Sequence, residues 1–388
     1  MKLQLSGLMP IVVAALAFVP VAAQQPDTSR PFVRGGVYDK PYLTTLFGRA
    51  AIGGYAEAHA RWNHVDGLTE DSGFELRRFN LFASTQVSDF VRFAAELEFE
   101  DAGEEVLLEF AAMDVIIHPA LMLRGGMILS PLGRFNLAHD SPLNEFTDRP
   151  LVSTGLIGVA LSEPGIGLLG SLPLGTNRIT YEAYAVNGYH DGLVLTSEGG
   201  TRIPLGRRNS EDNNSSPSFV GRVTWSPGLF LEVGASAHHG PYNVYERDGL
   251  EIDARRNLSI WVLDAETTIR GFRASGEYAA AAIDIPPGLR PLYAARQRGG
   301  YLEITYDLGR GWVTTMPGSR FTVATRIDAV DFDSDIRGDS ERRYQVGLNF
   351  RPTQETAIKL SYFRGNARDR FNNRSSLAGL RFSIATYF

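Results

Sequence analysis

Seven histidines could take part in acid–base chemistry, and two of them have a suitable neighbour in the sequence. Ser236 precedes His238 by two residues, and Glu57 precedes His59 by two. A hydrolase needs a histidine within hydrogen-bonding reach of its nucleophile, and a carboxylate beside a histidine can exchange a proton with it. Both pairs lie in segments of alternating polarity, where polar residues commonly line one face. We therefore predict no catalytic site.

Metal chemistry has one candidate segment. Asp331, Asp333 and Asp335 have the spacing of the first ligands of a calcium loop, but Ile336 stands where the turn needs glycine and Arg342 where a bidentate glutamate is needed. The chain also has no cysteine, which excludes thiol chemistry and cysteine metal sites. A solvated acidic loop is the better interpretation, and we expect no metal site and no cofactor.

A second set of charged residues lies in segments where polar and apolar side chains alternate. The charged residues at mid-segment are Arg78, Arg326, Lys359, Arg381, Glu96 and Glu98. A period of two is that of a β-strand with one apolar face. If these strands close into a ring with the apolar face outward, the charges face the interior, where they would select the solutes that pass.

The chain after residue 50 can be divided into about sixteen such strands, although fourteen or eighteen remain possible. Their expected ranges are 50–62, 72–86, 89–100, 104–117, 119–128, 157–170, 177–189, 217–226, 229–239, 256–269, 271–284, 297–308, 318–331, 340–352, 355–367 and 376–388. An even number is typical of bacterial single-chain barrels. The connections alternate between long and short, as they do between the two ends of a membrane barrel. The exceptions are a short 101–103 and a long 309–317.

Both ends of the chain indicate export to an outer membrane. Residues 1–23 have a basic start, an apolar run and small residues at 21–23, which is typical of a cleaved signal peptide. Residues 24–49 read as a periplasmic lead-in. The last strand carries Leu380, Phe382 and Ile384 on one face and ends on Phe388. We therefore predict an all-β fold, a transmembrane antiparallel β-barrel over 50–388. The net charge of −6 argues against a nucleic-acid partner.

Residues 74–82 (FELRRFNLF), the acidic strand 95–99 (AELEF) and residues 123–134 (LRGGMILSPLGR) resemble the phosphate-selective porin O/P family of Gram-negative bacteria. The resemblance implies a sixteen-stranded barrel in outer-membrane lipid, a homotrimer, that passes solutes by diffusion. It also implies recognition of the terminal Phe388 by the barrel-assembly machinery. Members that select phosphate carry a ladder of basic residues. Here only three lysines occur, and acids interrupt the arginines, so the resemblance favours a porin more than it favours phosphate.

The long connection 129–156 has the position of the loop that folds into the channel in general porins. Its charged residues are Arg134, Asp140, Glu145, Asp148 and Arg149. We expect this loop to face the wall that carries Arg78, Arg326, Lys359 and Arg381, and to set a transverse field in a constriction. The function expected from the sequence is passive diffusion of small polar or anionic solutes, including phosphate-like anions. The alternatives are a barrel enzyme (a lipase or a protease) and a non-conducting structural or adhesive barrel.

Overall fold

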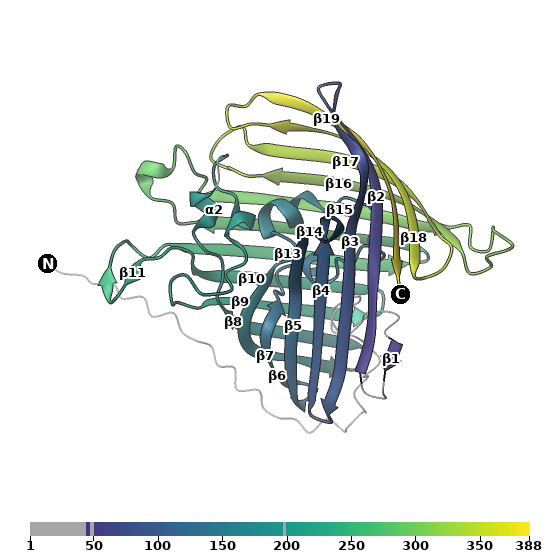
Figure 1. The fold of residues 1–388 in the computed structure, drawn as a ribbon, viewed down its shortest axis with the longest axis horizontal. Coiled ribbons are helices and arrows are strands. Elements are labelled where there is room, and N and C mark those ends of the chain that lie inside the picture. Colours follow the sequence, from purple (N-terminus) through teal and green to yellow (C-terminus); the bar gives the residue numbers. More distant parts are fainter. Residues whose placement is uncertain (1–43, 47–49, 197–198) are drawn as a thin grey trace.

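A computed structural model describes residues 44–46, 50–196 and 199–388 of the chain. The predicted signal peptide and nearly all of the lead-in lie outside these residues. Sixteen antiparallel strands form a closed barrel (Figure 1). The strands are β2 (Ala50–Val65), β3 (Leu68–Ser88), β4 (Val91–Glu100), β5 (Glu105–His118), β6 (Leu121–Leu129), β7 (Ser162–Leu174), β8 (Asn177–Val186), β9 (Ser218–Gly228), β10 (Leu231–Pro241), β13 (Asn257–Ile269), β14 (Phe272–Ile283), β15 (Arg296–Leu308), β16 (Arg320–Asp331), β17 (Ser340–Arg351), β18 (Thr356–Arg368) and β19 (Arg374–Tyr387). The predicted strand number and class of fold are confirmed.

The barrel closes between the last strand and the first long strand. β19 pairs antiparallel with β2 from Leu377 opposite Val65 to Tyr387 opposite Tyr55. Phe388 and Gly54 then exchange two backbone hydrogen bonds of 3.0 Å. A short strand, β1 (Thr44–Leu46), adds to the opposite end of β2. Every long strand thus has a neighbour on both sides, as a spanning sheet requires because lipid offers no hydrogen bonds.

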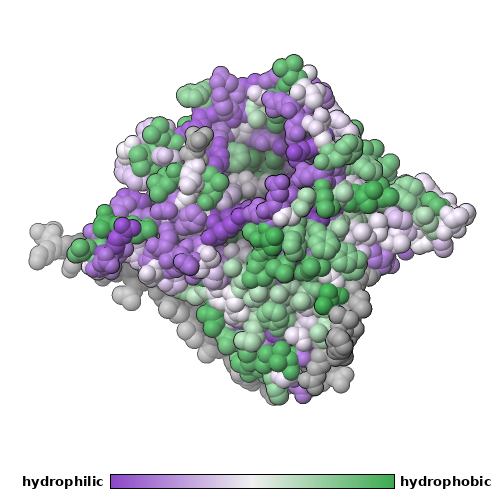
Figure 2. Space-filling view, viewed as in Figure 1, coloured by the Kyte–Doolittle hydropathy of each residue, from purple (hydrophilic) through white to green (hydrophobic). Residues whose placement is uncertain are grey.

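Side chains alternate between the lipid face and the interior as predicted. On β19, Leu380, Phe382 and Ile384 are exposed on the outside, while Arg381 and Ser383 are buried inside. Aromatic rings gather outside near the short-turn end, where Phe321 and Phe350 lie 4.9 Å apart between centroids. In Figure 2 hydrophobic residues cover the surface below a hollow whose rim is hydrophilic. Among the described residues no helix is long and apolar enough to cross a membrane.

Most strand boundaries differ from the sequence expectation by a few residues, and two of the differences have a clear cause. The first connection was expected to be long, over 63–71, but β2 and β3 continue through it to a two-residue turn. Asp66 (φ 51°) and Gly67 (φ 85°) both have positive φ there, as such a tight hairpin turn requires. β7 begins at Ser162 instead of residue 157, because Ile157, Val159 and Leu161 are packed inside the barrel.

An apolar core fills part of the interior. It combines the inward segment 130–161, which holds α1 (Arg134–Leu137) and a single π-turn, η2 (Ser153–Ile157), with a second segment, 187–217. The second segment holds α2 (Gly192–Leu195) and η3 (Ile203–Gly206). Buried residues of this core include Leu132, Val152, Leu156, Leu193, Ile203, Ile260, Val262 and Ala279. Part of a strand such as β13 is therefore apolar on both faces: Ile260 and Val262 face the core, whereas Asp264 further along the strand is an inward charge that pairs with Arg222.

Three small elements complete the described part of the chain. The turn η1 (Asp101–Gly103) joins β4 to β5, and η4 (Pro287–Leu289) lies between β14 and β15. A two-stranded hairpin, β11 (Glu246–Arg247) and β12 (Leu250–Glu251), projects from the long connection after β10 (Figure 1).

Candidate functional site: the interior passage

The inward segment is fixed to the barrel seam by polar contacts. The Tyr387 hydroxyl donates to Asp140 at 2.8 Å, and Ser141 Oγ donates to Glu57 at 2.6 Å. Lys359, which is fully buried, donates from Nζ to the Ser141 carbonyl at 2.7 Å. Tyr387, Glu57 and Lys359 belong to β19, β2 and β18. The predicted residues Asp140 and Lys359 therefore lie together at the seam, where Lys359 supports the segment's backbone.

Glu145 forms the second anchor. Its carboxylate lies 3.2 Å from Arg351 Nη2 and 2.7 Å from Arg273 Nη2, and it accepts a hydrogen bond of 2.7 Å from Asn349. Arg351 also donates to the Pro142 carbonyl at 2.7 Å. Burial alone would raise the pKa of Glu145, but Arg351 and Arg273 outweigh it and lower the pKa to about 2. Glu145 is thus a charged, buried residue that connects the segment to the wall.

We expect Glu145 to hold the segment less strongly at low pH. A released Glu145 would have a pKa near 4.5, so its stabilisation is complete above that pH and is lost as the pH falls toward 2. The difference between the two pKa values corresponds to about 3 kcal/mol. Single-channel recordings between pH 7 and pH 3 should show growing current noise below about pH 4.5. A Glu145→Gln variant should lack this part of the pH dependence. If wild type and variant respond alike, another group controls the response.

Asp148 lies between three wall arginines. It accepts from Arg381 Nε at 2.9 Å and lies 3.5 Å from Arg343 Nη1, while its backbone carbonyl accepts from Arg326 Nη2 at 2.7 Å. Arg326 also pairs with Asp328 and stacks over the ring of Phe146 at 4.7 Å. The segment therefore lies against the arginines of the wall. The opposite charges, however, lie in contact, so no solute can pass between them, and a field across an open gap is not what this geometry offers.

A polar cavity of about 360 Å³ lies beside these contacts, between the segment and strands β2, β3, β17 and β19. Its charged lining is rich in cations: six arginines and His59 against Asp71 and Asp148. The six arginines are Arg61, Arg77, Arg78, Arg149, Arg343 and Arg381. Several have acidic partners outside the lining, such as Glu75, which lies 2.8 Å from Arg61. The guanidinium groups of these pairs face the cavity and their acidic partners do not, so an anion in the cavity would contact the guanidinium groups.

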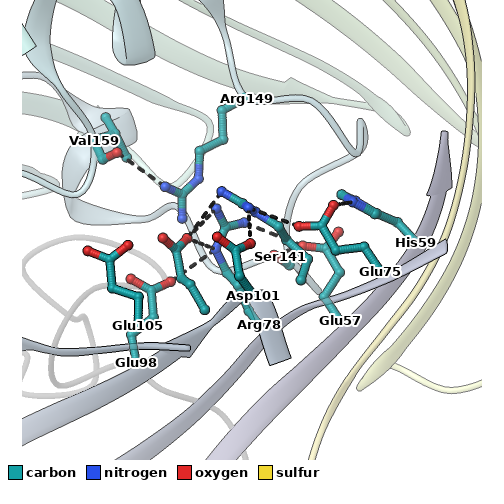
Figure 3. A network of polar contacts seen from close by, with 12 residues as sticks. Glu57, His59, Glu75, Arg78, Glu98, Asp101, Glu105, Ser141, Arg149 and Val159 are labelled. Atoms are coloured by element: carbon teal, nitrogen blue, oxygen red, sulfur yellow. Dashed lines mark hydrogen bonds and ion pairs between the residues drawn. The ribbon is translucent and has the colours of Figure 1, made fainter. Parts of the chain in front are cut away.

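Arg78 is the centre of a network at the base of this cavity (Figure 3). It pairs with Glu98 at 3.0 Å, with Glu100 at 3.0 Å and with Glu57 at 3.4 Å, and only Arg78 among these lines the cavity. The three carboxylates thus surround the single Arg78 cation; Glu57 and Glu98 are buried and Glu100 is partly buried. Arg78 and Glu98 are thus brought together, and the wall near them is mixed in charge.

The remaining predicted residues lie on other parts of the wall. Glu96 is buried and accepts from Asn80 at 2.6 Å. Arg134 belongs to α1 on the far side, where it lies 3.0 Å from Glu266. Arg149 donates to the Val159 carbonyl at 3.2 Å, inside the segment itself. The structure therefore gathers most of the predicted residues near the seam, including Glu96, which lies close to Tyr55 and Tyr387, and separates Arg134 from them.

The alternative sites considered from sequence have other partners. His238 lies 3.2 Å from Glu163, and Ser236 accepts from the Gly133 backbone, so Ser236 and His238 do not bond to each other. His59 pairs with Glu75 at 2.8 Å instead of Glu57. The three loop aspartates are each bound by an arginine, for example Asp333 by Arg370 at 3.2 Å. These contacts are those of structural residues.

Sequence reasoning missed Arg61, Arg77 and Arg343 as lining residues. Arg77 has a clear reason, because the pairing of β3 with β2 skips it at a β-bulge between Arg78 and Leu76. The bulge lets consecutive arginines both face inward. A signal was present: apolar residues of β3 fall at 74 and 76 and then at 79 and 81, so the alternation shifts by one residue.

Comparison with known proteins supports the fold. No protein-family model matches the chain. An uncharacterized protein of Aquifex aeolicus is 27% identical over 398 residues, covering 96% of this chain and 84% of that protein. Salmonella typhi OmpF in complex with daunomycin superposes with a TM-score of 0.57 at 12% identity, over 89% of this chain and all of OmpF. An anion-selective porin from Comamonas acidovorans gives 0.55 at 12% identity, over 87% and 99%. The chain thus has the fold of outer-membrane porins.

Proposed function

We propose that the protein is an outer-membrane channel for passive diffusion of small polar solutes, with a preference for anions. The observation that carries this proposal is the cavity of about 360 Å³ whose lining holds six arginines and one histidine against two aspartates. Charged groups that line a pore set its ion preference. The similarity in fold to an anion-selective porin agrees with this direction. Phosphate-like anions belong to the proposed class of solute, since planar guanidinium groups bind such oxyanions well.

The inward segment 130–161 would act as the constriction. Its anchors at Asp140, Glu145 and Asp148 hold it against the seam side of the wall, and the apolar core closes much of the opposite side. Solutes would then pass along the arginine-lined side only. The arginines that line this path come from β2, β3, β17 and β19 and from the segment itself.

A planar-bilayer experiment tests the proposal. We expect the refolded protein to give discrete conductance steps and a reversal potential on the anion side in a salt gradient. The homotrimer remains part of the proposal and should appear as steps in threes. The outward Gly54 is covered by the protein's own Phe388 ring, so the small residues Ala56 and Ala58 are the better candidates for a protomer contact. Stable insertion without conductance would instead favour the structural or adhesive barrel.

A further inference from the structure

The barrel wall has an interruption beside β5. β5 begins at Glu105, but its pairing with β6 starts only at Ala111, opposite Met127. The last two residues of β6 pair with β7 alone, and the chain then turns into the barrel. Residues 105–110 therefore have a strand neighbour on the β4 side alone. An uncovered strand edge is costly in a membrane. Here it is covered by side chains: Ser162 Oγ donates to the Glu109 carbonyl, and Arg208 lies 2.6 Å from Glu105.

A cavity of about 230 Å³ occupies this interruption. Leu108, which is 45% exposed, and Met127 line its outer side, while Glu98, Glu100 and Arg149 line its inner side. Segment 207–210 of the second long connection forms its roof. The cavity thus joins the apolar outer surface to the interior. Arg149 is shared with the arginine-lined cavity and separates the two spaces.

The cationic groups of this cavity are not fully satisfied. Arg149 uses Nη1 for the Val159 carbonyl, but its buried Nε and Nη2 have no hydrogen-bond partner among the described residues. Burial and the nearby Arg78 lower the pKa of Arg149. Arg207 donates only to the carbonyls of Gly158 and Val159. Buried charged donors without partners are costly, and a bound anion would satisfy them.

The carboxylates of the lining are already engaged. Glu98 and Glu100 both pair with Arg78, and Glu109 lies 3.1 Å from His139. They act on Arg149 and Arg207 electrostatically but leave Nε and Nη2 of Arg149 without a hydrogen bond, and Arg208 pairs with Glu105. The lining in which these cations lie is apolar where it meets the lipid face, at Leu108, Met127 and Pro164. A ligand that matches both features has an anionic head and an apolar chain.

We propose that this interruption is a lateral window that binds an anionic amphiphile from the surrounding membrane. The head group lies between Arg149, Arg207 and Arg208, and the acyl chain leaves past Leu108 and Met127. The Arg208–Glu105 ion pair closes the window over the head. The shared chemistry of the ligand is a carboxylate or phosphate head on a single acyl chain. This binding does not depend on whether the arginine-lined cavity conducts.

The test is a binding titration of the full-length protein, refolded in a neutral detergent, with the fluorescent fatty acid 11-(dansylamino)undecanoate. Arg208→Gln and Arg149→Gln should each weaken binding by about tenfold or more, which is about 1.4 kcal/mol. Arg247→Gln is the matched control, since Arg247 is an exposed arginine on the projecting hairpin. Equal affinity in all four proteins would show adsorption to the outer wall and would overturn the proposal.

Competition identifies the ligand class. Dodecanoate and dodecyl phosphate should both displace the fluorescent acid, and their relative strength distinguishes a carboxylate head from a phosphate head. Inorganic phosphate at the same concentration should not displace it. If inorganic phosphate, which has no acyl chain, displaces the fluorescent acid, the window is a simple anion site and the proposal is contradicted. Glu105→Gln provides a second variant that keeps all three arginines. It removes the ion pair that closes the window, so it should speed binding and release of the fluorescent acid.

Conductance separates this proposal from the proposed channel function. Arg208 lines the window and not the arginine-lined cavity, so Arg208→Gln should lose amphiphile binding while the ion preference stays unchanged. A protein that binds the acid but never conducts would contradict the channel and leave the window intact.

Discussion

Replacing Glu145 with glutamine should loosen the inward segment and raise the single-channel conductance, with frequent transitions between levels. The substitution keeps the shape of the side chain but removes the charge that faces Arg351 and Arg273. Arg351 is only 3% exposed and would remain as an uncompensated buried cation. Breaking a buried pair by removing one partner typically costs about 3–5 kcal/mol. Planar-bilayer recordings at neutral pH measure the effect directly.

Asp253→Asn is the control for this prediction. Asp253 also binds an arginine, Arg256 at 2.8 Å, but its side chain is 43% exposed in an outer connection. Exposed pairs contribute at most about 1 kcal/mol, so the conductance should not change. If Glu145→Gln also conducts like the wild type, the apolar core alone holds the segment in place.

Replacing Arg343 and Arg381 together with glutamine should reverse the ion preference. Both arginines line the cavity and both contact Asp148. Their removal takes two positive charges from the lining and leaves the Asp148 carboxylate without these partners. Two unit charges about 4 Å apart interact by about 1 kcal/mol in water and about 4 kcal/mol in a protein-like medium. A fall of the anion-to-cation permeability ratio by about tenfold, or about 1.4 kcal/mol, is therefore expected.

The reversal potential in a salt gradient measures this change. Arg256→Gln serves as the control, because Arg256 lies in the connection after β12 and not in the cavity lining. The reversal potential of the double variant should lie on the cation side at low salt. Its difference from the wild-type value should be smaller at high salt, where ions screen the charges of the lining. An unchanged potential would mean that the current takes a path outside the arginine-lined cavity.

The strands could be predicted from the sequence because their pattern is local. Residues 380–384 alternate so regularly that any shift by one residue would turn Phe382 into the interior, which fixes the face of each side chain. The tight turn at Asp66 and Gly67 was missed because polar residues that continue a strand look like a loop. The interior apolar core was missed for a related reason. On β13, Ile260 and Val262 face the core while Trp261 and Leu263 face lipid, so no alternation marks the inner side.

The site was less predictable than the strands because its charges pair over long distances in sequence. Asp148 could be recognised as a loop acid, but its partner Arg381 lies 233 positions away. Neither the register that makes them meet nor the contact that removes the expected gap is visible in the sequence. Arg149 illustrates the same limit. It lines both cavities because the chain turns into the barrel after β6, and this change of direction is not visible in the sequence.

The junction of β2 and β19 has a consequence for how the molecule is made. The Ser376 backbone donates to Asp66, a residue 310 positions earlier, and the two hydrogen bonds of Phe388 complete the ring. Contacts between residues so distant form slowly, because the chain must first search for its own other end. β19, the strand that seals the ring, is synthesised after the fifteen others, so the ring cannot close while they are being made. Until β19 is paired, the edge of β2 lacks a strand neighbour over most of its length and must be kept from pairing with other chains.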